Sequence, residues 1–199
     1  MDDIIATLAQ RAADSGIEVI VVSADKDLMQ LVRDNVSMFD PMKGKLYQRD
    51  EVVEKFGVAP ELVADALALA GDASDNIPGV PKVGPKSAAK LIQEFGDVEA
   101  VIAGVATIEK PKAFQRSVIE NAESARLSKR LTVLSYEAPV ELDEEALLYT
   151  SPNPDKLVPF LESIEARTLL RDFRVTIPPV DATPKDAPSQ ASETIESTQ

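Results

Sequence analysis

The chain has 199 residues and contains no cysteine, no histidine and no tryptophan. Without cysteine it has neither disulfides nor thiolate metal sites. Without histidine it lacks the commonest general base and zinc ligand, so any hydrolysis must depend on carboxylates, lysine or metal-bound water. The ions that suit carboxylate and water ligands are Mg²⁺ and Mn²⁺. No apolar run approaches the roughly 18 residues of a membrane span and no signal peptide is recognisable, so we expect a cytoplasmic protein without a membrane partner.

Positive charge is also scarce, and the formal net charge is −13. This balance argues against a general nucleic-acid binder, because such proteins are usually basic. The charges are unevenly distributed, however. Acidic residues gather at 141–145 and in the tail, whereas residues 77–93 form a cationic island. The uneven distribution of charge therefore leaves the segment 77–93 suited to binding a polyanion.

Residues 71–90 are the most informative stretch. Asp72 and Asp75 supply carboxylates that suit a divalent cation. Gly79 and Gly84 then punctuate the start of a helix, where close backbone approach and outward N–H groups suit a phosphate. The same segment carries the lysines Lys82, Lys86 and Lys90. An acid cluster beside a phosphate-binding turn predicts metal-assisted chemistry on nucleic acid. The alternative is a loop between two helices with solvated lysines.

The first quarter of the chain has an α/β pattern. Apolar spacing predicts a helix over 3–15, and the continuous apolar run 17–22 predicts a parallel strand covered on both faces. Asp25 and Asp27 follow at the carboxyl end of that strand, where open α/β sheets place ligand sites. A short helix at 28–33 and strands at 36–39 and 45–47 complete this part.

The remainder is mostly helical. The expected helices cover 49–56, 60–70, 83–95, 97–103, 112–134, 154–164 and 166–173. Pro85 suits the first turn of the helix at 83–95. From residue 178 onward, Pro, Asp, Ser, Thr and Glu predominate, which predicts a disordered linker or tail that protease should remove first.

The run Gly71-Asp-Ala-Ser-Asp-Asn-Ile-Pro-Gly-Val-Pro-Lys-Val-Gly-Pro-Lys-Ser-Ala resembles a motif of the 5′-nuclease family. That family includes the flap endonucleases and the 5′–3′ exonuclease domain of bacterial DNA polymerase I, to which the similarity is closest. Ser23-Ala-Asp-Lys-Asp27 resembles the family's strand end. Asp2-Asp3 resembles the last two residues of its Glu-Ala-Asp-Asp motif. The resemblance covers roughly residues 2–175.

The resemblance implies a fold and a domain plan. The expected class is α/β, with the remnant of a parallel-sheet nuclease core over 1–48. A mostly helical region over 49–175 follows, with a helix–three-turn–helix DNA-binding element at 71–95. Together, residues 1–175 form the carboxy-terminal part of a 5′–3′ exonuclease domain, and 176–199 form the linker. Because the chain starts at Met1 within the family motif, we expect it to lack the family's first strand and its basic helical arch.

The resemblance implies two-metal phosphodiester hydrolysis as the chemistry. Because the chain is expected to be incomplete at its amino terminus, we expect it to be weakly active or inactive alone. By resemblance, Asp2 and Asp3 are catalytic and bind the metal nearest the scissile phosphate, while Asp25, Asp27, Asp72 and Asp75 bind the second metal. The implied DNA-binding residues are Gly79, Val80, Lys82, Val83, Gly84, Lys86, Ser87 and Lys90. The implied cofactors are two Mg²⁺ or Mn²⁺ ions and a K⁺ ion at the DNA-binding turn. The implied partners are duplex DNA with a 5′ flap, nick or primer end, and polymerase domains, in the bacterial cytosol.

Each site has a structural alternative. The pair at residues 2 and 3 could cap a helix, Asp27 could cap the turn after its strand, and Asp72 and Asp75 could form a turn and a cap. For the whole chain, the alternatives are a non-catalytic duplex-DNA-binding fragment and a bare structural fragment whose strand 17–22 has an exposed apolar edge. If the carboxylates do meet, their repulsion predicts that neutralising Asp72 together with Asp75 stabilises the metal-free chain.

Overall fold

The computed structural model describes residues 1–149 and 151–176, which form nine α-helices, two 3₁₀ helices and three strands. Contacts divide the chain into a unit over residues 1–144 and a second unit from residue 145 onward, and each is described by itself. The predicted domain boundary at 175 stays a prediction. The predicted linker over 176–199 lies outside the described residues except for Thr176, which ends the last described helix. No described helix is long and apolar enough to cross a membrane.

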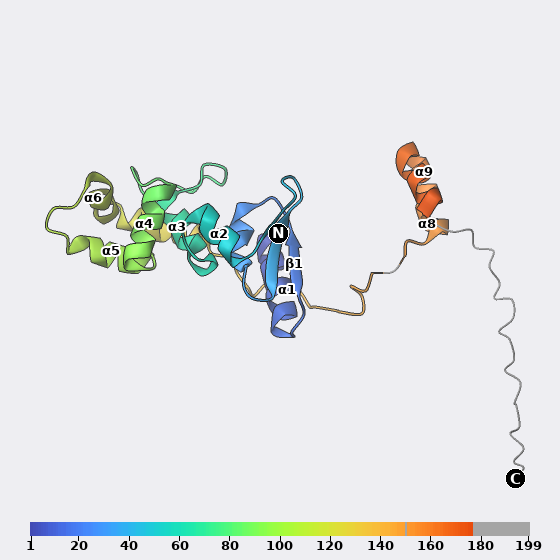
Figure 1. The fold of residues 1–199 in the computed structure, drawn as a ribbon, viewed down its shortest axis with the longest axis horizontal. Coiled ribbons are helices and arrows are strands. Elements are labelled where there is room, and N and C mark those ends of the chain that lie inside the picture. Colours follow the sequence, from blue (N-terminus) through green and yellow to red (C-terminus); the bar gives the residue numbers. More distant parts are fainter. Residues whose placement is uncertain (150, 177–199) are drawn as a thin grey trace, which may run out of the picture. The chain divides into compact units, whose positions relative to one another are not determined.

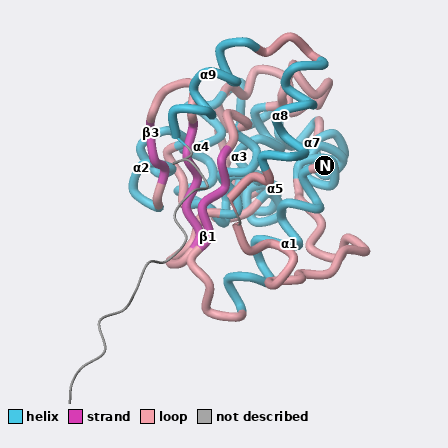
Figure 2. Tube along the Cα trace, turned by 90° about the vertical axis from the view of Figure 1, so that its right-hand side faces the viewer, coloured by secondary structure: helices cyan, strands magenta, loops and turns pink. Residues whose placement is uncertain are grey.

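The first unit opens with α1 (Asp2–Asp14), which leads into a three-stranded sheet (Figures 1 and 2). The strands are β1 (Val19–Val22), β2 (Val36–Asp40) and β3 (Lys45–Tyr47), in the order β1-β2-β3. β1 pairs with β2 in parallel, with Val21 opposite Met38, and β2 pairs with β3 in antiparallel fashion. The mixed α/β class and all three strands are therefore confirmed.

The prediction that β1 is covered on both faces is wrong. Val21 is 7% exposed, whereas Ile20 is 55% and Val22 65% exposed. Within the described part of the chain, β1 pairs with β2 alone, so it is an edge strand with only one buried face. The exposed apolar edge expected of an incomplete sheet is present.

After β3 the chain becomes helical and forms α2 (Arg49–Phe56), the 3₁₀ helix η2 (Pro60–Leu62) and α3 (Val63–Ala70). α3 is the centre of this region, because every one of its residues except Ala70 is buried. It contacts η1 (Lys26–Leu31), α4 (Pro85–Phe95) and α7 (Ala122–Thr132). One buried helix thus connects the strand end with the helices that surround residues 71–84.

The predicted single helix over 112–134 is wrong, because the chain forms α6 (Ala113–Glu120) and then α7. The break falls at Asn121, whose backbone leaves the helical region at φ −122° and ψ 32°. The Asn121 amide donates a 2.8 Å hydrogen bond to the carbonyl of Ser117. The Asn121 backbone N–H donates to the same carbonyl at 3.0 Å, so both bonds end α6 at this residue. Before these helices, α5 (Val98–Ala106) extends beyond the predicted 97–103.

The second unit contains α8 (Pro154–Ser163) and α9 (Arg167–Thr176), close to the predicted helices. The Asn153 side chain caps α8 by accepting a 2.9 Å hydrogen bond from the Asp155 N–H. Glu165 has a φ of +54° between the two helices, which reverses the chain direction.

Candidate metal and DNA-binding site

The turn after β1 orients the first acidic side chain. Asp25 Oδ1 accepts a 3.0 Å hydrogen bond from the Asp27 N–H, so Asp25 is the cap of η1. Asp27 is therefore not the capping residue that the structural alternative assumed. The cap fixes the start of η1 and leaves the Asp27 side chain available for other contacts.

A second loop brings further carboxylates to the same place. Ligand oxygens of Asp27, Asp72 and Asp75 all lie within 4.8 Å of one another. Asp72 is 6% exposed, Asp27 is partly buried and Asp75 is exposed. The structure thus brings together the strand end and the loop before α4, as the sequence predicted. Asp25 is outside this group of three, which we call the carboxylate cluster.

Burial and charge act differently on the members of the cluster. Burial, together with the charges of Asp25 and Asp72, raises the pKa of Asp27 to about 6. Burial also acts to raise the pKa of Asp72, but the ion pair with Lys26 and the hydrogen bonds from Ser74 outweigh it and lower that pKa. Asp72 is therefore stabilised as an anion, and simple repulsion among the carboxylates does not describe it. That neutralising Asp72 together with Asp75 stabilises the metal-free chain stays a prediction, and the lowered pKa of Asp72 argues against a gain from the Asp72 change.

The cluster fits a divalent cation. Asp27 Oδ1 is buried and has no hydrogen-bond partner. A buried carboxylate oxygen without a donor is costly unless a cation neutralises it or the group is protonated. Three carboxylates with this spacing are the oxygen ligands that Mg²⁺ and Mn²⁺ prefer, directly or through waters.

Asp2 and Asp3 lie in the first turn of α1, and neither belongs to a described cluster of three or more metal-binding side chains. Asp3 Oδ1 accepts a 2.8 Å hydrogen bond from the Ser135 N–H, which joins α1 to the segment after α7. Their predicted metal role stays a prediction, and the described structure gives Asp3 a backbone-binding role.

The loop between α3 and α4 is organised around Gly79. Its φ is +61°, and a Cβ added there would lie 2.3 Å from the backbone nitrogen of Gly71. Asp72 and Ile77 exchange two backbone hydrogen bonds of 3.0 and 2.8 Å, so residues 72–77 form a small hairpin inside this loop. Only glycine fits at position 79, because the loop closes against its own start.

Serines of α6 and α7 hold this loop. The Gly79 N–H donates a 3.0 Å hydrogen bond to Ser128 Oγ, and Ser124 Oγ donates a 2.8 Å bond to the Gly79 carbonyl. Ser117 Oγ donates a 2.5 Å bond to the Pro81 carbonyl. The prediction that the Gly79 N–H points outward to a phosphate is therefore wrong, because this N–H is buried and donates its hydrogen bond to Ser128.

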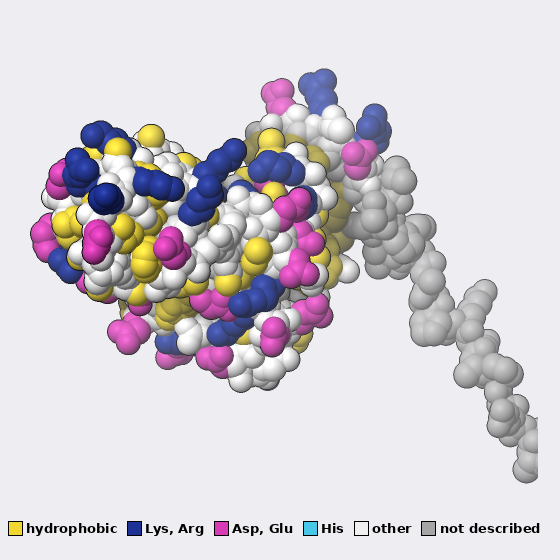
Figure 3. Space-filling model, turned by 60° about the vertical axis from the view of Figure 1, so that its left-hand side comes forward, with side chains coloured by type: hydrophobic (Ala, Val, Ile, Leu, Met, Phe, Trp, Pro, Cys, Tyr) yellow, Lys and Arg dark blue, Asp and Glu magenta, His cyan; other side chains and the backbone are white. Residues whose placement is uncertain are grey.

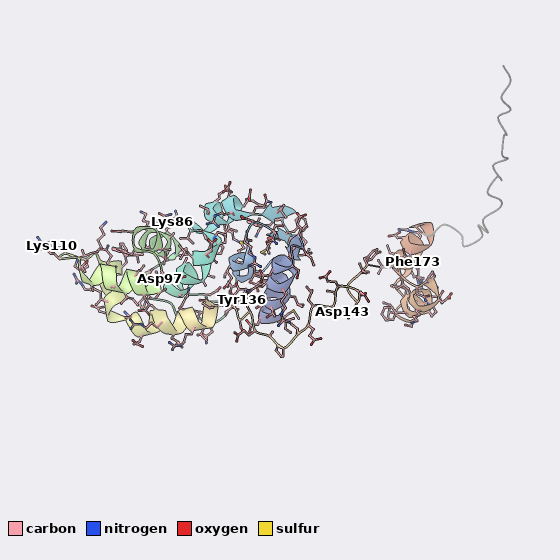
Figure 4. The ribbon with its side chains drawn as sticks, turned by 90° about the horizontal axis from the view of Figure 1, so that it is seen from below. Lys86, Asp97, Lys110, Tyr136, Asp143 and Phe173 are labelled. Carbon is pink, nitrogen blue, oxygen red and sulfur yellow. The ribbon has the colours of Figure 1, made fainter. Side chains whose placement is uncertain are left out.

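The cationic side chains of the predicted DNA-binding segment are at the surface. Lys82, Lys86 and Lys90 are exposed, and within residues 1–149 and 151–176 none of them forms an ion pair. Lysine and arginine side chains gather on the face drawn in Figure 3, and Figure 4 labels Lys86 on α4. These ammonium groups are free to bind an external anion.

The other members of the predicted DNA-binding set differ in accessibility. Ser87 is partly buried, and Gly84 has open space where a Cβ would be. Val80 and Val83 are 3% and 4% exposed. These two valines therefore pack the loop onto the core and are not positioned to touch DNA directly.

Sequence reasoning missed two groups of residues. Lys26 stands inside the Asp-Lys-Asp segment, and its ammonium lies 2.5 Å from Asp72 Oδ2. The available signal was a cation placed between two aspartates at a strand end. Ser124 and Ser128 lie one helical turn apart on α7, and nothing in the sequence alone distinguishes them from solvated serines.

Comparisons with known proteins agree with this geometry. The family model "5′-3′ exonuclease, N-terminal resolvase-like domain" matches residues 1–57, and "5′-3′ exonuclease, C-terminal SAM fold" matches residues 58–155. DNA polymerase I of Rhizobium leguminosarum is 44% identical over 170 residues, which cover 85% of this chain and 17% of that protein. The 5′-3′ exonuclease of Aquifex aeolicus is 37% identical over 171 residues, 86% of this chain and 57% of that protein.

Solved structures point the same way. A bacteriophage T5 flap endonuclease in a complex with DNA and metal ions has a TM-score of 0.61 and 25% identity, and the match covers 66% of this chain and 48% of that one. Fold and sequence similarity together place the chain in a class of nucleases. More particularly, the chain belongs to the 5′-3′ exonuclease family, of the DNA polymerase I type. It spans less than two thirds of the length of these curated relatives.

Proposed function

We propose that this chain supplies the DNA-holding part and one metal site of a 5′–3′ exonuclease or flap endonuclease that hydrolyses phosphodiester bonds near a DNA 5′ end. The observation that carries the proposal is the continuity of one loop. Residues 72 and 75 belong to the carboxylate cluster, and the same loop runs through Gly79 into α4 with its free lysines. A phosphate bound by these lysines is thereby placed in a fixed relation to the cluster.

Asp27, Asp72 and Asp75 are the residues that would hold a divalent ion, Mg²⁺ or Mn²⁺. Such an ion supplies Lewis-acid stabilisation of negative charge on a phosphate. Lys82, Lys86 and Lys90 bind the backbone of duplex DNA with a 5′ flap, nick or primer end, and this orients the substrate without reading its sequence. By the family resemblance, we also propose that Asp2 and Asp3 serve the metal nearest the scissile phosphate, that K⁺ binds at the DNA-binding turn, and that polymerase domains and a cytosolic setting accompany the longer protein.

A specific observation favours a second candidate, the non-catalytic duplex-DNA-binding fragment. Asp3 Oδ1 is engaged by the Ser135 N–H, and neither Asp2 nor Asp3 joins the carboxylate cluster in the described chain. A protein whose carboxylate cluster holds only one cation would retain DNA without hydrolysing it. Both candidates share the surface formed by Lys82, Lys86 and Lys90, which we call the lysine surface. They differ in whether the bound DNA is hydrolysed.

The test combines binding with cleavage of a labelled 5′-flap duplex. We expect binding in chelator, and with Mg²⁺ or Mn²⁺ cleavage much slower than that of the Aquifex aeolicus 5′-3′ exonuclease. Lys86→Glu should weaken binding and lower the salt slope by about one unit, because one phosphate contact is lost. Lys110→Glu, which changes an exposed residue outside the segment, is the matched control (Figure 4).

The outcomes separate the two candidates. Slow, metal-dependent cleavage that Asp72→Asn abolishes supports the nuclease. Binding without any cleavage supports the non-catalytic fragment. Equal affinities of wild type, Lys86→Glu and Lys110→Glu at low salt would exclude the lysine surface as the DNA-binding site.

A further inference from the structure

Lys26 places its own positive charge on the carboxylate cluster. Its Nζ lies 2.5 Å from Asp72 Oδ2 and 3.5 Å from Ser74 Oγ. The Asp72 side chain is 4% exposed, while the Lys26 side chain remains 38% exposed. Oδ2 accepts no hydrogen bond of good geometry, so its contact with the ammonium is an ion pair. The cluster is therefore partly neutralised from within the chain.

The ammonium occupies the one Asp72 oxygen that a metal could use. Asp72 Oδ1 already accepts two hydrogen bonds from Ser74, one from its N–H at 3.0 Å and one from its hydroxyl at 2.5 Å. These bonds saturate the lone pairs of Oδ1. A divalent ion that binds Asp72 must therefore approach Oδ2, where Lys26 lies.

An ammonium and a divalent ion cannot both remain in contact with this oxygen. Metal–oxygen bonds to Mg²⁺ are about 2.0–2.1 Å long, so the two cations would lie a few ångströms apart and repel strongly. Lys26 can leave, because its side chain is flexible and partly exposed. Binding of the metal then costs the free energy of the ion pair that it breaks.

We propose that Lys26 is a built-in competitor of the divalent cation: it stabilises the metal-free carboxylate cluster and lowers the affinity of the site for Mg²⁺ or Mn²⁺. The proposal rests on the metal site of the proposed function. It identifies Lys26 as a residue that sets the affinity of that site. Cations that bind too weakly to displace the Lys26 ammonium from Asp72 are excluded.

The test measures binding of Mn²⁺ alone to the full chain, without DNA, by calorimetry or by the electron paramagnetic resonance signal of free Mn²⁺. We expect Lys26→Met to bind Mn²⁺ about three- to tenfold more tightly than wild type, since the competing ion pair is gone. Lys26→Arg keeps the cation and should stay close to wild type. Lys110→Met makes the same change of net charge away from the cluster and is the control.

A second measurement is the melting temperature in chelator. Lys26→Met should melt lower than wild type, because an anionic cluster has lost its counter-ion, and should gain more from Mn²⁺ than wild type does. Lys26→Gln, which retains a hydrogen-bond donor, serves if the methionine variant does not fold. A cooperative melt of either variant shows that the comparison concerns a folded protein.

The outcomes distinguish this inference from the proposed function. If wild type binds Mn²⁺ and Lys26→Met and Lys26→Gln bind it equally or more weakly, the competitor role is wrong and the metal site stands. If Lys26→Met and Lys26→Gln bind measurably while wild type and Lys26→Arg do not, the competitor role is supported in its strongest form. If no variant binds Mn²⁺, both the metal site and the competitor role are overturned.

Discussion

The N–H of Gly79 donates a 3.0 Å hydrogen bond to the hydroxyl of Ser128, a residue that is 0% exposed in the middle of α7. The Gly79 carbonyl accepts a 2.8 Å bond from Ser124, one turn earlier on the same helix. The N–H and the carbonyl of Gly79 are thus both hydrogen-bonded to serines of α7. Because Asp72 and Lys86 lie on either side of Gly79, α7 fixes the relation between the carboxylate cluster and the lysine surface.

Replacing Ser128 with alanine should therefore destabilise the protein. The substitution leaves the buried Gly79 N–H without a partner, which costs about 1–3 kcal/mol. Urea unfolding monitored by circular dichroism measures the loss. The DNA affinity of the folded variant should fall while its salt slope stays unchanged, because the three exposed lysines are retained.

Ser15→Ala is the matched control, since Ser15 is exposed at the end of α1. We expect it to change the free energy of unfolding by no more than about 0.5 kcal/mol. Equal stabilities of the Ser128→Ala and Ser15→Ala variants would mean that the bond to Gly79 contributes nothing.

Gly79→Ala and Gly84→Ala form a pair with opposite expectations. At position 79 the new Cβ would lie 2.3 Å from the Gly71 nitrogen and 2.5 Å from its Cα, and the φ of +61° is itself unfavourable for alanine. We expect a loss of about 3–5 kcal/mol or failure to fold. At position 84 nothing lies within 4 Å of the added Cβ and φ is −92°, so the cost should not exceed about 1 kcal/mol. Thermal unfolding of both variants compares them directly, and equal losses would contradict the packing described for residue 79.

Asp27 should make the metal-free protein less stable as the pH rises. Its pKa in the folded protein is about 6, above its usual value, so the folded protein keeps a proton that the unfolded chain releases. The resulting stabilisation is complete below about pH 4 and is lost as the pH rises through about 6. Asp27→Asn cannot lose this proton.

The difference in unfolding free energy between Asp27→Asn and wild type, measured in chelator, should therefore move in favour of the variant between about pH 4 and neutral pH. We expect a change of about 1–2 kcal/mol after allowing for the partial exposure of the group. A difference that does not depend on pH would show that Asp27 titrates normally.

Local features of the sequence were sufficient for much of the fold. The helix after Gly84-Pro85 begins as expected, because proline at a first-turn position and the following apolar spacing are local signals. The break at Asn121 was not predicted, because a single residue leaves the helical region there within an otherwise helical sequence pattern. The open face of β1 was missed because a continuous apolar run indicates strand burial without showing whether the covering layer is present.

The candidate site shows the same division. That Asp27 meets Asp72 and Asp75 followed from family motif order, since their separation along the chain exceeds any local periodicity. The contributions of Lys26 and Ser128 depend on tertiary contacts alone. The opposite pKa shifts of Asp27 and Asp72 also required the structure, because the pKa of an aspartate depends on its burial, its neighbouring charges and its hydrogen-bond donors.

These opposite shifts lead to the last prediction, which compares Asp27→Asn with Asp72→Asn. In chelator at neutral pH, Asp27→Asn should raise the melting temperature, because the anion it removes is disfavoured by burial and by neighbouring carboxylates. Asp72→Asn should lower the melting temperature, because it removes the ion pair with Lys26 and weakens the bonds from Ser74. Millimolar Mn²⁺ should raise the melting temperature of wild type, since the ion binds the folded state, and should do so much less in either variant. The matched control is Asp143→Asn, outside the cluster (Figure 4), which should respond to Mn²⁺ as wild type does. If Mn²⁺ leaves the wild-type melting curve unmoved, the carboxylate cluster is not a metal site. If both variants instead melt higher than wild type in chelator, Lys26 and Ser74 do not stabilise the Asp72 anion as the structure indicates.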